Sequence, residues 1–151
     1  MRHLFIVAVF LLMSLVPQAF CQERTAVDSL SRGDLTVIVK GLENDDGTVR
    51  IALSDSEEGY TSGGRPFRRT AVPIQKGIAR YTFTDIPYGE YAVKVYHDED
   101  GDEELDTGMF GIPEEAYGFS NNAAASFGPP DFEDAKFHFK KRSLIIEISV
   151  E

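Results

Sequence analysis

Apolar and polar residues alternate along the chain from Asp34 onward, and this period of two constrains the fold more than any other sequence feature. Every second residue is Leu, Val or Ile in residues 35–39 and again in residues 49–53. Side chains two apart share one face of a β-strand, whereas a helix repeats its apolar face every three or four residues. No convincing helical spacing follows Asp34. The pattern therefore predicts an all-β domain.

Turn-forming Gly, Pro, Asn and Asp separate about seven expected strands. The first two strands, joined by a turn over residues 41–47, are expected to form a hairpin. Pro73 favours an edge position for the third strand, because proline donates no ladder hydrogen bond. The predicted fold is a single antiparallel β-sandwich of immunoglobulin-like or transthyretin-like type, with a partly closed β-barrel as the alternative. The expected strands cover residues 34–40, 49–54, 69–75, 78–84, 91–97, 135–139 and 144–150.

The first 21 residues have the pattern of an export signal. A short basic start precedes an apolar run over residues 4–16, and small residues then mark a cleavage region. That run is shorter than the roughly 20 residues that a membrane span needs. We expect cleavage after Cys21, a flexible segment over residues 22–33, a β-sandwich domain over residues 34–151, and a periplasmic or secreted protein. A lipoprotein anchored through Cys21 is the alternative, although Phe20 is bulkier than the small residue such signals carry.

The charge of the chain limits its partners. The formal net charge is −10, and loss of Arg2 with the signal makes it −11. Such a surface repels phosphate backbones, so we expect neither nucleic acid nor anionic membranes as partners. Cys21 is the only cysteine, so cleavage after it leaves no thiolate for a disulfide or a zinc site.

Seven of the nine residues from Asp98 to Asp106 are acidic, directly after an expected strand. Carboxylates packed into one loop repel one another, and a bound hard cation would relieve that repulsion. Calcium takes six to eight oxygen ligands, which alternate residues of a curled loop can supply. Gly101 permits the tight curl. The expected calcium ligands are the side chains of Asp98, Asp100, Asp102 and Asp106 and the backbone carbonyl of Glu104.

Two other metal-binding arrangements fit the sequence less well. An EF-hand needs glycine at its sixth position and glutamate at its twelfth, where this chain has Glu103 and Met109. A transition metal is disfavoured because only His97 adjoins the oxygen donors. A solvated acidic turn without a metal is the alternative to calcium.

Residues 98–134 form a 37-residue excursion that is expected to be irregular. Loops of that length in a compact domain are usually functional or disordered. Five aromatic side chains within it either cap the end of the sandwich or line a groove for a ligand. Carbohydrate or a cell-surface protein is the expected partner. The aromatic residues are Phe110, Tyr117, Phe119, Phe127 and Phe132, and the candidate ligand surface is Phe110, Tyr117, Phe119, Asn121 and Asn122.

Nothing in the sequence favours an enzyme. It shows no recognisable Ser-His-Asp arrangement and no glycine-rich phosphate loop. Glu114 and Glu115 near Tyr117 are compatible with a carboxylate-dependent hydrolase, but they more simply indicate a turn after Pro113. We therefore expect a non-catalytic protein.

Several strings within residues 34–150 resemble a family of small exported bacterial proteins, domain of unknown function 2141. Tyr-Gly-Phe-Ser-Asn-Asn is the most specific of them. The resemblance implies export, one β-rich domain and no assigned activity. Glu103 and Glu104 depart from it, because such proteins are richer in Asn and Gly there. The matching strings are His97–Asp102, Leu105–Asp106, Gly111–Glu114, Tyr117–Asn122 and Phe132–Ala135.

The sequence leads to two hypotheses. In the first, the protein is an exported β-sandwich binding or structural module in which calcium holds the long excursion in shape. In the second, it is a purely structural domain of the cell envelope, and the acidic loop is incidental.

Overall fold

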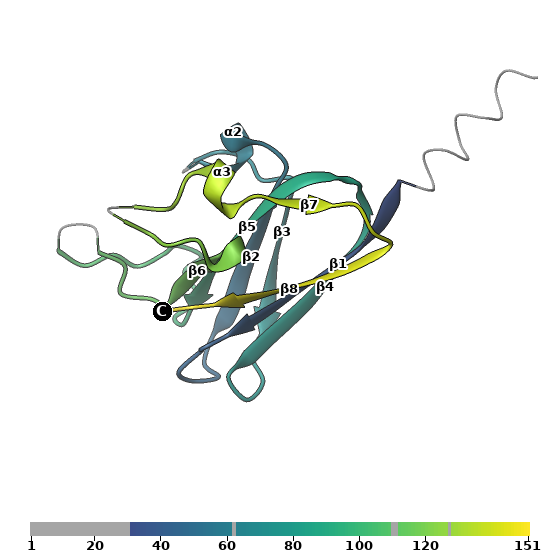
Figure 1. Ribbon diagram of the computed structural model, residues 1–151. Helices are drawn as coiled ribbons and strands as arrows, with labels where there is room; N and C mark the ends of the chain where they lie inside the picture. Colours follow the sequence, from purple (N-terminus) through teal and green to yellow (C-terminus); the bar gives the residue numbers. More distant parts are fainter. Residues whose placement is uncertain (1–30, 62, 110–111, 127) are drawn as a thin grey trace, which may run out of the picture. The chain divides into compact units, whose positions relative to one another are not determined.

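A computed structural model describes residues 31–61, 63–109, 112–126 and 128–151 of the chain. The expected export signal, most of the expected flexible segment, Phe110 and Phe127 lie outside these residues. Within them, no helix is long and apolar enough to cross a membrane. The strands are β1 (Arg32–Lys40), β2 (Thr48–Ser54), β3 (Arg68–Pro73), β4 (Ile78–Pro87), β5 (Gly89–Asp98), β6 (Tyr117–Phe119), β7 (Phe137–Phe139) and β8 (Ser143–Ser149). The helices are α2 (Glu57–Tyr60), the 3-10 helix η2 (Ser120–Asn122) and α3 (Phe132–Ala135), and Figure 1 shows all these elements along the chain.

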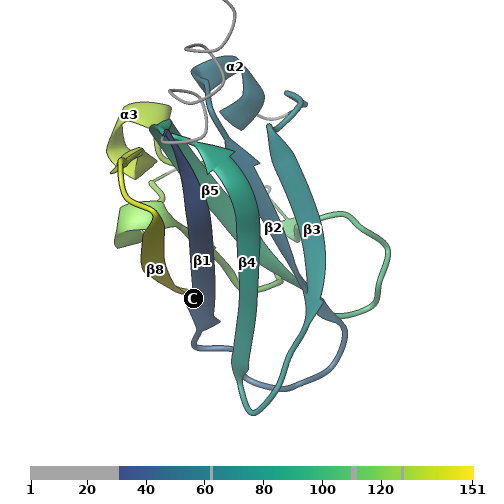
Figure 2. The same cartoon turned by 90° about the vertical axis from the view of Figure 1, so that its right-hand side faces the viewer.

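The strands form two sheets, which confirms the predicted β-sandwich. One sheet has the order β4-β1-β8, and the other has the order β3-β2-β5-β6 with β7 also paired to β5. Figure 2 shows β8, β1 and β4 side by side in front of β5, β2 and β3. Most pairs are antiparallel, but β1 and β8 are parallel. The immunoglobulin-like or transthyretin-like subtype stays a prediction.

The core lies between the two sheets, where the alternating residues meet. Leu35, Val37, Val49 and Leu53 are completely buried, and all belong to the same apolar cluster. Burial of one such side chain contributes about 1.5–3 kcal/mol relative to exposure. The predicted inward faces of β1 and β2 are therefore confirmed.

The expected hairpin between β1 and β2 is wrong. β1 pairs with β4 and β8, whereas β2 pairs with β3 and β5 in the other sheet. Alternation determines which face of a strand is buried, but not which strand lies beside it. Leu42, in the connecting loop, is buried in the core as the chain crosses from one sheet to the other.

Asp45 fixes that crossing loop to the turn between β3 and β4. Its carboxylate accepts hydrogen bonds from the backbone N–H of Gly77 (2.7 Å) and Lys76 (2.8 Å). These bonds favour the charged carboxylate and hold the pKa of Asp45 below its usual value. β3, which ends at Pro73, lies at the edge of its sheet as predicted.

Three ordered elements lie in the excursion that was expected to be irregular. β6 extends the second sheet beside β5, η2 follows β6 directly, and α3 begins at Phe132. The Phe132 ring packs edge-on against Tyr60, with 5.8 Å between the ring centroids. A strand of three residues is too short to show a period in the sequence, which is why alternation did not reveal β6.

The approach of β6 to β8 requires glycine at residue 118. A methyl group on Gly118 would lie 2.7 Å from the backbone oxygen of Ser149 and 2.9 Å from the Ile148 side chain. We expect Gly118→Ala to lower the free energy of unfolding by about 1–3 kcal/mol, as overpacking does. Gly89→Ala is the control for chemical denaturation, because its methyl would meet only the Tyr91 ring at 3.4 Å. Equal effects of the two substitutions would contradict this role of Gly118.

Candidate functional site

The acidic loop, residues 98–106, starts on a buried ion pair. Asp98 is the last residue of β5, and its side chain is completely buried. Arg50 of β2 donates from Nε to Asp98 Oδ2 at 2.8 Å, and its Nη2 lies 3.2 Å from Glu103 Oε1. The hydrogen bond to Asp98 is the main cause that raises the pKa of Arg50. The guanidinium group of Arg50 therefore neutralises part of the negative charge of the loop.

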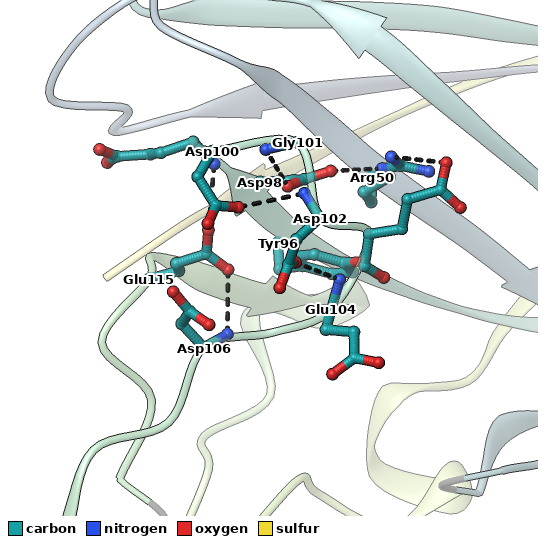
Figure 3. Close-up of polar contacts among 11 residues, drawn as sticks. Arg50, Tyr96, Asp98, Asp100, Gly101, Asp102, Glu104, Asp106 and Glu115 are labelled. Carbon is teal, nitrogen blue, oxygen red and sulfur yellow. Dashed lines mark hydrogen bonds and ion pairs between the residues drawn. The ribbon is translucent and has the colours of Figure 1, made fainter.

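Three of the expected calcium ligands converge. One carboxylate oxygen from each of Asp98, Asp100 and Asp102 lies within 4.8 Å of the others. Backbone N–H groups of the loop hold these side chains: Gly101 donates to Asp98 Oδ1 (2.9 Å), Asp102 to Asp100 Oδ1 (3.1 Å) and Glu104 to Asp102 Oδ1 (2.7 Å). Figure 3 shows this succession along the curl of the loop. In the described part of the chain, Asp100 and Asp102 each keep a second oxygen without a hydrogen-bond partner.

The other two expected ligands are the backbone carbonyl of Glu104, which stays a prediction, and the side chain of Asp106. The Glu104 side chain, which was not an expected ligand, points away from the cluster (Figure 3). Asp106 is not among the three converging residues. Asp106 is exposed, but a partial loss of hydration raises its pKa, and the negative charges of Asp100 and Asp102 raise that pKa further. Arg50 therefore leaves negative potential uncompensated at this end of the loop.

Glu115 lies outside the acidic loop but contacts it, a role that the sequence did not reveal. Its side chain is buried, and its two oxygens accept hydrogen bonds from the backbone N–H of Glu99 (3.0 Å) and Asp106 (3.1 Å). Glu114 N also donates to Asp106 O at 2.8 Å. Glu115 thus joins both ends of the acidic loop (Figure 3). In the sequence, Glu115 stands beside a second glutamate, Glu114, and nothing local indicates which of the two is buried.

Gly101 and Glu103 give the loop its curl. Both have positive φ angles, 81° at Gly101 and 72° at Glu103. Gly101 adopts this conformation freely, as expected, but a non-glycine residue rarely does. The Tyr96 hydroxyl donates to the Glu103 carbonyl at 2.6 Å, and Arg50 pairs with the Glu103 carboxylate. These two contacts hold the residue that departs from the Asn- and Gly-rich pattern.

His97 lies outside the cluster of three carboxylates. Its ring is buried, with Nε2 2.7 Å from the Asp46 carbonyl oxygen and Nδ1 3.4 Å from Glu99 Oε1. His97 is not among the residues whose ligand atoms converge. The geometry agrees with an interpretation of His97 as a strand-end residue.

A cavity of about 1000 Å³ lies over the outer face of the second sheet, next to the acidic loop. Glu103 and Leu105 of the loop form part of its wall. Its floor consists of outward side chains in two rows that cross β3, β2, β5 and β6 in register. The first row is Arg69, Ala52, Lys94 and Phe119, and the second is Ala71, Arg50, Tyr96 and Tyr117.

The cavity contains two of the candidate ligand-surface residues, Tyr117 and Phe119. Asn121 and Asn122 do not line it. The Asn121 amide donates to the carbonyls of Asp134 (3.1 Å) and Lys136 (2.8 Å), and the Asn122 amide oxygen accepts from Ser149 N (2.9 Å). Both asparagines are exposed and connect η2 to neighbouring segments, and their part in a ligand surface stays a prediction.

A small, mostly antiparallel β-sandwich with an acidic loop beside an open cavity is the class of protein that these features define. The chain belongs to a family described as an uncharacterized protein conserved in bacteria, domain of unknown function 2141, which matches residues 37–147. The family resemblance seen in the sequence is therefore confirmed. No curated protein and no solved structure matches the chain.

The double hydrogen bond of Glu115 is testable with its neighbour as the control. We expect Glu115→Gln to lower the free energy of unfolding by about 1–3 kcal/mol, because the amide places an N–H donor where a backbone N–H needs an acceptor. Hydrogen exchange at the amides of Glu99 and Asp106 should accelerate in parallel. Glu114 is exposed and makes no side-chain hydrogen bond in the described residues, so Glu114→Gln should change neither quantity. Unchanged exchange in Glu115→Gln would contradict the assignment.

Proposed function

We propose that this protein is an exported β-sandwich binding module whose acidic loop is stabilised by calcium. The observation that carries the proposal is the convergence of Asp98, Asp100 and Asp102 within 4.8 Å. Three carboxylates at this separation repel one another strongly unless a cation lies between them. Arg50 reaches only Asp98 of the three.

The chemistry of the donors favours calcium over other metals. Calcium prefers six to eight oxygen ligands at about 2.3–2.6 Å and tolerates irregular geometry. The three converging carboxylates supply part of that set, and water or a nearby loop carbonyl can complete it. Histidine and cysteine, which transition metals prefer, are absent from the converging group.

Calcium would act on the cavity through the wall that the acidic loop forms. Glu103 and Leu105 line the cavity and lie within two residues of Asp102 or Asp106 along the chain. A cation that fixes the curl would therefore fix that wall. Aromatic rings such as Tyr117 and Phe119 provide flat apolar surfaces of the kind that bind carbohydrate or a protein side chain. These are the partners that we propose.

A binding role accounts for the two glutamates better than hydrolysis does. Glu115 uses both carboxylate oxygens to hold backbone N–H groups of the loop. Glu114 is exposed. A general acid and base pair needs two carboxylates that face one substrate, so we propose that the protein is not a hydrolase.

Calcium should raise the melting temperature of the protein, and the acidic loop should be responsible. At free calcium of about 100 times the dissociation constant, the expected stabilisation is about 2.7 kcal/mol. We expect the double substitution Asp100→Asn, Asp102→Asn to abolish the shift, because it removes two of the three charges. Asp131→Asn is the matched control: Asp131 is exposed outside the loop and makes no side-chain capping bond to α3.

A melting temperature that calcium leaves unchanged would refute the calcium site. The purely structural envelope domain would then be the better description of the acidic loop. A shift of the same size in the double variant would likewise place the calcium elsewhere.

Export predicts a defined mature mass. We expect mass spectrometry of the protein recovered from bacterial cells or medium to give the mass of residues 22–151, without a lipid. A mass that includes residues 1–21 would contradict export, and a lipid adduct on Cys21 would favour the lipoprotein alternative.

A further inference from the structure

The cavity beside the acidic loop is cationic, although the chain as a whole carries a net charge of −10. Three basic residues, Arg50, Arg69 and Lys94, line it, and Glu103 is the one acidic residue in the described lining. Arg50 is neutralised by Asp98 and Glu103. The local charge of the floor therefore comes from Arg69 and Lys94.

Lys94 is the more unusual of these two cations. Its side chain is half-buried, and its ammonium group donates to the Tyr60 carbonyl and lies 4.8 Å from the centroid of the Tyr60 ring. Among the described residues no carboxylate pairs with it. Burial lowers the pKa of Lys94, as expected for an ammonium group that lacks a counter-ion. A charge left partly desolvated in this way gains most from an anion that enters the cavity.

Strand register brings Arg69 and Lys94 to one part of the floor. Ala52 pairs with Arg69 on one side and with Lys94 on the other, so the two basic side chains flank a single alanine. The short alanine side chain leaves space between them. Arg69 is exposed and has no ion-pair partner in the described part of the chain.

Aromatic side chains continue the same two rows. Phe119 follows Lys94 in the first row, and Tyr117 follows Tyr96 in the second. The Tyr117 and Phe119 rings pack edge-to-face, with 5.8 Å between centroids, and both line the cavity. Phe119 is only 7 % exposed and Tyr117 is half-buried, so Tyr117 and the accessible edge of Phe119 form the aromatic side of the floor, opposite the two cations.

We infer that the cavity binds a small organic anion, with its carboxylate or phosphate group between Lys94 and Arg69 and its flat apolar part on Phe119 and Tyr117. The volume of about 1000 Å³ accommodates a ligand of this size. The inference rests on the binding role proposed above, for which it names the ligand class. It does not require calcium.

The test compares charged and neutral ligands of one shape. Naphthoate and naphthyl phosphate are the anionic probes, and naphthalenemethanol is their neutral counterpart. Isothermal calorimetry on the mature protein should show at least one anion binding about tenfold more tightly than the alcohol, since one charge-assisted hydrogen bond is worth at least that much. Equal affinities, or no binding of either anion at millimolar concentration, would overturn the inference.

Substitutions of Arg69 and Lys94 test whether these two side chains bind the anionic group of the ligand. We expect Arg69→Gln and Lys94→Met each to weaken binding of the anion by about tenfold and to leave the affinity for the alcohol unchanged. Arg80→Gln is the control, because Arg80 is an exposed cation of β4 outside the lining, and its loss changes the net charge equally. If Arg80→Gln weakens binding as much as Arg69→Gln, only the overall charge matters and the site is wrong. Arg69 is exposed, so its variant is informative even if Lys94→Met unfolds.

Calcium and chelator arms separate this inference from the calcium proposal. Anion binding in chelator supports the cationic site even where calcium leaves the melting temperature unchanged. A calcium-dependent melting temperature without anion binding in either arm retains the calcium site and refutes the anion site.

Discussion

The ion pair between Arg50 and Asp98 is the contact on which both the acidic loop and the cavity depend. The Asp98 side chain is completely buried and that of Arg50 is 24 % exposed. Removal of one partner from a buried pair costs about 3–5 kcal/mol, because the other charge stays buried and unpaired. The pair fixes the first residue of the acidic loop to β2, and Arg50 also holds Glu103, which forms part of the cavity wall. Arg50 therefore contacts the acidic loop through its ion pairs and also lines the cavity.

The sequence predicted the faces of the strands but not their neighbours. Alternation identifies the inward side of Val49 and Leu53 because the environment changes at every residue. It carries no information on whether β1 lies beside β2 or across the core from it. The convergence of Asp98, Asp100 and Asp102 was predictable for a related reason. Alternate residues of a tightly curled loop face its inside, so the spacing alone suggested the cluster.

Contacts between residues that lie far apart in the chain could not be predicted from the sequence. Glu115 lies 16 residues after Glu99, and nothing local distinguishes it from the exposed Glu114. Lys94 and Arg69 resemble the solvent-facing charges that most strands carry. Only the register of both strands against Ala52 places them together. The fold class could therefore be predicted from the local alternation of residues. The cationic floor of the cavity could not, because it depends on how β3, β2 and β5 pair.

Arg50 also makes the two proposed ligands interdependent. A calcium ion at Asp98 would share that carboxylate with the guanidinium, and the two cations repel each other. The charge of Arg50 would then be less compensated on its cavity side, where an anion between Lys94 and Arg69 experiences it. Calcium should therefore strengthen anion binding. Because linkage is reciprocal, the anion must strengthen calcium binding by the same factor. A chain with seven carboxylates in one loop can in this way favour an anion beside it, provided that one arginine faces both sites.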